Sequence, residues 1–162
     1  MKEKIVSAEQ AAAIANELRA NNQKLVFTNG CFDLLHVGHV RYLAAARALG
    51  DALLVAVNGD DSVRTLKGDG RPINRAPDRA EVVAALESVD HVVIFPEVRA
   101  TALLEKVRPA IYVKGGDYTA ESLHAEERSA LEENGAEIRI LPFEAGYSTT
   151  NLLEKMPQPE RE

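Results

Sequence analysis

The segment KLVFTNGCFDLLHVGH, residues 24–39, contains the pattern that decides the fold. Its first five residues form a short, largely apolar run, and Asn29 and Gly30 close it, which is typical of a buried strand. A helical pattern then begins at about Val37. Free backbone N–H groups and the helix dipole make such a strand-to-helix junction an anion site. The segment therefore predicts phosphate binding at the carboxyl end of a buried strand.

Two histidines of this segment, His36 and His39, are three residues apart near the helix start, so we expect them roughly on one face. Imidazoles beside a phosphate can donate hydrogen bonds to its oxygens as charge develops there. Gly30 permits a tight turn, and Gly38 is expected to leave room for a phosphate. These features together predict a phosphate site with paired histidines.

Other sites with a related signature are excluded by the rest of the chain. An H-x-x-H pair is also half of a zinc site, but zinc needs further ligands, and His91 and His124 have no such neighbours in the sequence. Neither G-x-x-x-x-G-K-[ST] nor G-x-G-x-x-G occurs, which argues against a P-loop kinase and a dinucleotide-dependent dehydrogenase.

Outward from this segment, apolar strands and helices alternate along the chain. The helix at 37–49 is expected to bury Val40, Leu43 and Ala44 and to use Gly50 as its C-cap, while residues 67–77 read as a loop. Strands are expected at 24–28, 52–57, 91–95, 111–113 and 137–141. Further helices are expected at 8–21, 60–66, 78–88, 98–107, 122–134 and from about 150. Ser7 is the expected N-cap of the first of these helices, and Asp60 and Asp61 are expected to cap the second. The pattern predicts an α/β fold, a doubly wound (Rossmann-like) five-stranded parallel sheet with helices on both faces. Ligands of such sheets bind at the carboxyl ends of the strands.

Length and composition indicate the number of domains, the cellular compartment and the class of ligand. A length of 162 residues is typical of one domain, which we expect at 1–155, followed by a disordered tail at 156–162. The chain has a single cysteine, Cys31, which excludes an internal disulfide. We expect a cytoplasmic protein, because the sequence has neither a signal peptide nor a membrane-spanning run. The net charge of −6 argues against nucleic acid. Five basic against two acidic residues at 64–79 indicate a small anionic ligand instead.

Four motifs carry a resemblance to a known family. They are N-G-C-F-D-L-L-H-V-G-H at 29–39, L-K-G-D-G-R-P-I-N at 66–74, V-K-G-G-D-Y at 113–118 and G-Y-S-T-T-N at 146–151. Over residues 24–155 the chain resembles the cytidylyltransferase-like nucleotidyltransferases, and among them the D-glycero-D-manno-heptose 1-phosphate adenylyltransferases. Phe143 stands where cytidylyltransferases of this superfamily tend to carry Arg, which agrees with the heptose branch. These enzymes often form the C-terminal half of a bifunctional kinase–adenylyltransferase. This chain is too short to include the sugar kinase, so we expect the free-standing form.

The resemblance implies transfer of AMP from ATP to D-glycero-D-manno-heptose 1-phosphate, which gives ADP-heptose and pyrophosphate for lipopolysaccharide or a related glycan. It further implies Mg²⁺ that bridges the phosphates, although the sequence identifies no protein ligands for the metal, and a homodimer. Two alternatives stay open: a cytidylyltransferase that acts on glycerol 3-phosphate or another small phosphorylated acceptor, and a non-catalytic nucleotide sensor.

The same resemblance assigns expected roles to individual residues. The catalytic residues are His36, His39 and Lys67. The nucleotide-binding residues are Asn29, Gly30, Cys31, Phe32, Gly38, Arg71, Lys114, Gly115, Asp117, Ser148, Thr149 and Thr150. The sugar-phosphate-binding residues are Asp33, Asn58 and Arg71. The loop at 67–77 is expected to be mobile until phosphate charge pairs with its cations.

Overall fold

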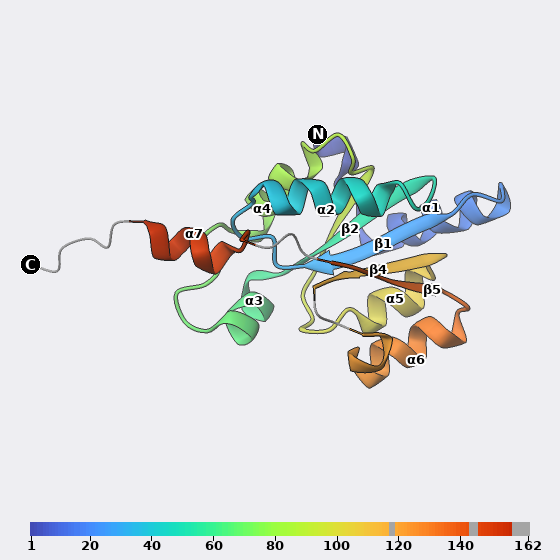
Figure 1. The fold of residues 1–162 in the computed structure, drawn as a ribbon. Coiled ribbons are helices and arrows are strands. Elements are labelled where there is room, and N and C mark those ends of the chain that lie inside the picture. The colour runs from blue at the N-terminus through green and yellow to red at the C-terminus, as the bar shows by residue number, and fades with distance from the viewer. Residues whose placement is uncertain (117–118, 143–145, 157–162) are drawn as a thin grey trace, which may run out of the picture.

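Five parallel strands form one sheet in the computed structural model, which describes residues 1–116, 119–142 and 146–156. Along the sheet the strand order is β3-β2-β1-β4-β5 (Figure 1). The strands are β1 Leu25–Gly30, β2 Ala52–Asn58, β3 His91–Phe95, β4 Ile111–Gly115 and β5 Glu137–Leu141. The chain builds outward from β1 to β3 and then crosses to β4 on the other side of β1. This order confirms the predicted doubly wound sheet and puts its switch point between β1 and β4.

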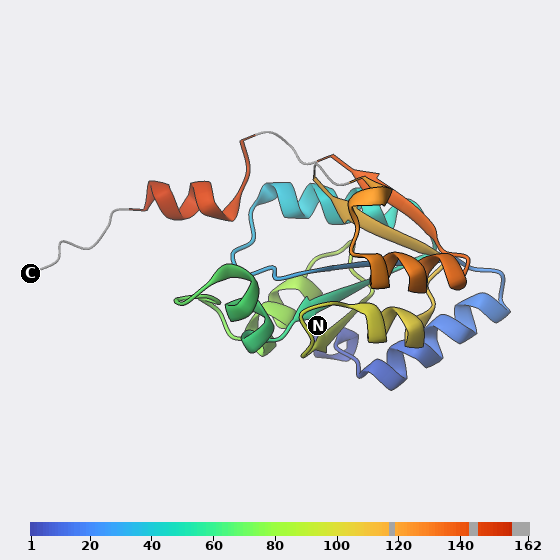
Figure 2. The ribbon, with the colours of Figure 1, turned by 90° about the horizontal axis from the view of Figure 1, so that it is seen from below.

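Helices cover both faces of the sheet (Figure 1). On one face lie α1 Ala8–Ala20, α5 Thr101–Val107 and α6 Ala125–Glu133, and on the other lie α2 Val37–Arg47 and α4 Ala76–Ala84. The remaining elements are α3 Asp60–Lys67, α7 Thr149–Lys155 and the short 3₁₀ turns Lys2–Lys4 and Ala120–Ser122. In both views α7 extends away from the sheet (Figures 1 and 2), and none of its residues is buried.

Burial on both faces explains why the strands are continuously apolar. In β2, Leu53 packs among the residues of α2 and α4, and its neighbour Leu54 packs among those of α1, α5 and α6. Successive side chains of a strand point to opposite faces, so each must be apolar when both faces are covered. Each such leucine contributes roughly 1.5–3 kcal/mol by leaving water.

The sequence predictions for α2 need two corrections. Leu43 and Ala46 are its buried residues, whereas Val40 and Ala44 are exposed, because the face toward the sheet passes through positions 39, 43 and 46. Gly50 does not cap this helix, which ends at Arg47. The lack of a side chain at Gly50 matters for packing, since a Cβ there would lie 2.7 Å from the carbonyl oxygen of Lys24.

The predicted capping by Asp60 and Asp61 is also wrong. Gly59 is the N-cap of α3, and both aspartates lie inside its first turn. The Asp60 carboxylate instead accepts a hydrogen bond from the backbone N–H of Ala76, at a distance of 2.8 Å. That bond satisfies a free donor at the start of α4, which begins two residues before the prediction.

Two further observations concern the ends and the environment of the chain. Of the predicted tail, the described part of the chain includes Met156 alone, and residues 157–162 lie outside it. Within the described ranges, no helix has both the length and the apolar character needed to cross a bilayer.

Candidate active site

A pocket of about 590 Å³ opens at the carboxyl ends of β1, β2 and β4. It brings together most of the residues that the sequence singled out, although they come from distant parts of the chain. The predicted residues that line it are Asn29, Gly30, Cys31, Phe32, Asp33, His39, Asn58, Lys67, Arg71, Lys114, Gly115, Thr149 and Thr150.

Three predicted residues lie beside this pocket without lining it: His36, Gly38 and Ser148. The space at Gly38 is taken by protein rather than left for a phosphate, since a Cβ there would meet the His36 ring at 2.9 Å and Cβ of Tyr147 at 3.0 Å. Ser148 caps α7, where its hydroxyl accepts from the N–H of Asn151. The predictions for Asp117 and Phe143 fall outside the described residues.

The two histidine rings lie against each other at the start of α2, with their planes tilted by 35°. Their ring centroids are 4.0 Å apart, and the His39 ring also contacts Phe32 at 5.7 Å. Phe32 has a φ of 46°, in the left-handed region that a bulky residue seldom adopts. This strained turn carries the chain from β1 toward α2 and sets the Phe32 ring, 7% exposed, beside His39.

The environment of His39 keeps the imidazole neutral. Burial, with a smaller contribution from neighbouring His36, lowers the pKa of His39 from 6.5 to about 4. The backbone N–H of His36 lies 3.3 Å from Nδ1 of His39 and donates to it. An imidazole that accepts at Nδ1 carries its proton on Nε2. His39 can therefore offer an N–H donor to a phosphate oxygen in the pocket.

This depressed pKa predicts a pH-dependent stability. Between pH 6.5 and about 4 the unfolded chain protonates His39 and the folded chain does not, so the free energy of unfolding should fall as the pH is lowered through that window. Urea unfolding of the wild type and of His39→Gln, at several pH values, measures the effect. The variant should show a shallower decline, and identical pH profiles for the two proteins would contradict the assignment.

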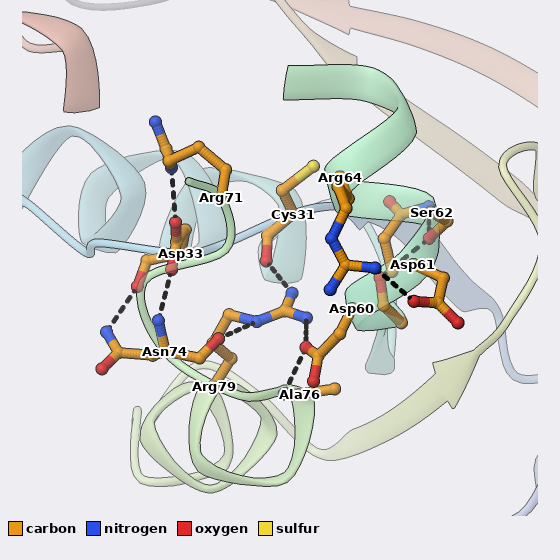
Figure 3. A network of polar contacts seen from close by, with 12 residues as sticks. Cys31, Asp33, Asp60, Asp61, Ser62, Arg64, Arg71, Asn74, Ala76 and Arg79 are labelled. Carbon is orange, nitrogen blue, oxygen red and sulfur yellow. Dashed lines mark hydrogen bonds and ion pairs between the residues drawn. The ribbon is translucent and has the colours of Figure 1, made fainter. Parts of the chain in front are cut away.

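Asp33 anchors the loop that the sequence predicted to be mobile (Figure 3). Its carboxylate is almost fully buried and accepts hydrogen bonds from Nε of Arg71 at 2.7 Å and from the backbone N–H groups of Ile73 and Asn74 at 2.9 Å. Burial opposes ionisation, but the bonds from Asn74, Ile73 and Arg71 outweigh it and lower the pKa of Asp33.

Two sequence expectations change as a result. The Asp33 carboxylate is committed to the protein's own loop, which leaves little capacity for a sugar phosphate. The guanidinium of Arg71 was expected to find a partner only when phosphate binds, yet it is already paired with Asp33 through Nε. Its two terminal nitrogens have no partner among the described residues and can still contact a ligand.

A buried arginine joins this loop to the rest of the site (Figure 3). Arg79 is 1% exposed and donates to the carbonyl oxygens of Cys31 and Asn74 and to the Asp60 carboxylate, the last at 2.8 Å. It thereby ties the turn after β1, the loop before α4 and the start of α3 to one another. The loops that line the pocket are held by a network of charged hydrogen bonds rather than by an apolar core.

Cations gather in the same pocket. Lys67 ends α3, Arg71 follows in the loop and Lys114 lies at the end of β4. Burial lowers the pKa of Lys114, the Glu127 carboxylate opposes this shift, and the charges of Arg99 and Lys67 add to it. Thr149 and Thr150 contribute hydroxyl groups from α7, and the Thr149 hydroxyl donates to the Leu34 carbonyl oxygen. The arrangement suits a ligand with several negative charges.

Comparison with known proteins decides the family. The model of the cytidylyltransferase-like family matches residues 27–155. This chain belongs to the cytidylyltransferase-like family. The match covers the β1–α2 junction, the loop before α4 and the start of α7, and it confirms the resemblance drawn from the four sequence motifs.

Individual relatives of the family agree. The chain is 53% identical over 137 residues to the bifunctional protein HldE of Methylococcus capsulatus, which covers 85% of this chain and 29% of that protein. It is 48% identical over 153 residues to HldE of Geotalea uraniireducens, covering 94% of this chain and 31% of that protein. The chain thus spans less than a third of these relatives. The lipopolysaccharide core biosynthesis protein from Thermoplasma volcanium has a similar solved structure, with a TM-score of 0.63 and 27% identity over 75% of this chain and 97% of that chain.

The cytidylyltransferase-like pocket also contains residues that the sequence analysis missed: Tyr42, Leu66, Val98, Arg99 and Glu127. Tyr42 stands next to the predicted apolar residue Leu43, so its position in α2 could have signalled a role near β1. Arg99 and Glu127 carry no local signal, because only the packing of α5 and α6 brings them to the pocket.

Mg²⁺ is the metal that the family resemblance implies. Among the described residues no group of three or more His, Cys, Asp or Glu side chains is arranged to hold a metal ion. Both pocket carboxylates, Asp33 and Glu127, already accept hydrogen bonds from the protein. The described residues therefore present no protein-held magnesium site, and no step of the chemistry is assigned to one.

Proposed function

We propose that the protein transfers AMP from ATP to D-glycero-D-manno-heptose 1-phosphate and releases ADP-heptose and pyrophosphate. The observation that carries this proposal is the pocket at the switch point of the sheet, where a neutral histidine N–H donor and three cationic side chains face one space. Donors and cations around one space favour transfer of a phosphorus-bearing group over chemistry that needs a base or a protein nucleophile.

The proposed reaction is a single in-line displacement. An oxygen of the sugar phosphate attacks the α-phosphorus of ATP, the new P–O bond forms as the bond to the β-phosphate oxygen breaks, and the electron pair leaves with pyrophosphate. The attacking oxygen is already an anion, so no general base or covalent intermediate is required. The contribution of the protein is alignment and charge stabilisation.

Different residues of the pocket align the substrates and stabilise the charge. His39 donates from Nε2 to an oxygen of the α-phosphate, where charge grows in the transition state, and Lys67 neutralises the transferring group. The terminal nitrogens of Arg71 and the hydroxyl of Thr150 bind the phosphates that leave, since the Thr149 hydroxyl already donates its proton to the Leu34 carbonyl oxygen. His36 lies outside the pocket lining and supports His39 through the bond from its backbone N–H.

The relatives support the substrate assignment. Two HldE proteins at 48% and 53% identity are named bifunctional, and the match falls on under a third of each, as expected for one of two activities. The similar Thermoplasma volcanium protein is named for lipopolysaccharide core biosynthesis. Together with the heptose-branch motifs at 66–74 and 113–118, these names favour a heptose phosphate acceptor.

Several parts of the proposal remain predictions. Mg²⁺ is expected to arrive with ATP, held by the phosphates and water. We keep the expectations of one catalytic domain at 1–155, a homodimer and a cytoplasmic location.

Nucleotide choice provides a direct prediction. With the heptose 1-phosphate as acceptor, kcat/KM for ATP should exceed that for CTP by roughly ten-fold or more, because a site that hydrogen-bonds one base leaves its polar groups unpaired with another. Pyrophosphate release, measured with each nucleotide in turn, gives both values. A preference for CTP, or activity confined to glycerol 3-phosphate, would establish the cytidylyltransferase alternative. Binding of ATP without release of pyrophosphate in the presence of any of the acceptors would indicate a nucleotide sensor.

A further inference from the structure

The pocket has a second wall that the proposed phosphate chemistry does not use. Val98 and Arg99 precede α5, Glu127 lies in the first turn of α6, and Lys114 ends β4. Helices α5 and α6 pack on the face of the sheet opposite to α2, which carries His39. The pocket therefore spans the edge of the sheet, with the histidine on one side and a mixed-charge wall on the other.

Glu127 is the unusual residue of this wall. It is 3% exposed, and one carboxylate oxygen accepts a hydrogen bond of 2.9 Å from the backbone N–H of Ala100. Among the described residues this is the one hydrogen-bond donor to its carboxylate, which has room for about four. A buried carboxylate with so few donors is costly. Its position in the pocket lining lets a ligand supply the missing donors.

The charges beside Glu127 indicate which part of a ligand belongs there. A carboxylate repels the triphosphate of ATP and accepts hydrogen bonds from hydroxyl groups. Lys114 lies close enough to both Glu127 and Arg99 for its charge to interact with theirs. Cations next to a hydroxyl-accepting carboxylate match a molecule that carries both a phosphate and several hydroxyls.

The geometry of the displacement points the same way. In-line attack needs the acceptor on the side of the α-phosphorus opposite to the leaving pyrophosphate. The groups assigned to the leaving phosphates, Thr150 and Arg71, come from α7 and from the loop before α4, which are different elements from the wall formed by α5 and α6. The acceptor then faces Glu127.

We propose that Glu127, Lys114 and Arg99 form the acceptor subsite, in which Glu127 accepts hydrogen bonds from the hydroxyls of a phosphorylated polyol and the two cations hold its phosphate. The inference rests on the proposed nucleotidyl transfer, and it adds a specificity determinant for the acceptor. It assigns Lys114, which the family resemblance gives to the nucleotide, to the acceptor instead. Glu127 thereby takes the sugar-binding role that the sequence assigned to Asp33, whose carboxylate already accepts hydrogen bonds from the protein's own loop.

Glu127→Gln tests the subsite, with Glu126→Gln as the matched control from the exposed side of the same helix. Pyrophosphate release is measured while the heptose 1-phosphate or ATP is varied. Loss of a hydrogen bond to a charged group should raise KM for the acceptor roughly ten-fold or more. KM for ATP should stay within about two-fold, as should both constants of the control. A rise confined to KM for ATP would assign Glu127 to the nucleotide and overturn the proposal.

Calorimetric titration of the heptose 1-phosphate, in the presence of a non-hydrolysable ATP analogue, measures acceptor binding without turnover. Weaker binding by Glu127→Gln and by Arg99→Met, a variant of an exposed residue with little effect on folding, supports the subsite. Unchanged acceptor affinity together with a lowered melting temperature would show that Glu127 only stabilises the start of α5. That result would overturn the proposed subsite. A wild-type protein that binds the acceptor and releases no pyrophosphate would instead refute the proposed function and leave the subsite supported.

Discussion

His39→Ala is expected to lower kcat by about 10²–10³, because the neutral imidazole donates to an oxygen whose charge grows only in the transition state. Its pKa of about 4 means that the donor is an uncharged N–H throughout the physiological range, so binding of ground-state ATP depends on it less. KM for ATP should therefore change much less than kcat. Steady-state pyrophosphate release with the wild type and the variant measures both constants.

The control for this prediction concerns folding. His39 packs against Phe32 and accepts one hydrogen bond, so its loss should cost little stability, about 1 kcal/mol. A thermal melt of His39→Ala close to that of the wild type, together with collapsed activity, separates chemistry from structure. Near-normal kcat in a folded His39→Ala protein would remove this residue from the mechanism.

Arg79→Met should produce the largest loss of stability, about 3 kcal/mol. The arginine is 1% exposed and its removal leaves the carbonyls of Cys31 and Asn74 and the Asp60 carboxylate without their donor. Breaking a buried pair costs about 3–5 kcal/mol. The lower end applies here because the Asp60 side chain is 35% exposed and can be hydrated. Urea unfolding of the two proteins measures the difference.

Arg75→Met is the matched control, since Arg75 is exposed one turn earlier at the start of the same helix and its side chain makes no capping bond. It should change the free energy of unfolding by no more than about 0.5 kcal/mol. Arg79→Met should also raise KM for ATP, because the loop that carries Arg71 loses one of its anchors. A variant as stable as Arg75→Met would show that the network around Arg79 does not hold the site together.

Local pattern accounts for what could be predicted correctly. The alternation of apolar strands and helices identified the parallel sheet. The strand-to-helix junction at 24–39 predicted a candidate site at the carboxyl edge, and a pocket lies there. Ser7 was predicted as an N-cap, and its side chain does accept from the N–H of Gln10. These features depend on residues within one or two turns of one another, where spacing alone restricts the structure.

Errors in the prediction arose where contacts between distant residues decide the outcome. The predicted buried face of α2 included Val40 and Ala44 beside Leu43, but the helix buries Leu43 and Ala46. The error arose because the apolar pattern of that helix is weak and Val40 is exposed. Asp60 was read as a cap of its own helix, whereas its carboxylate binds Ala76 and Arg79. No spacing rule connects a side chain to a backbone N–H group 16 residues away or to a guanidinium 19 residues away.

The sequence by itself determined the fold class and the family, and it placed His39 at a strand-to-helix junction, because each of these depends on patterns of consecutive residues. Only the tertiary structure decided that Asp33 holds the loop of Arg71, 38 residues away, and that Glu127 reaches the pocket from α6. Both outcomes depend on which elements the sheet order brings together at its carboxyl edge. A carboxylate there is free for a ligand only if no backbone N–H or guanidinium of the folded chain reaches it first.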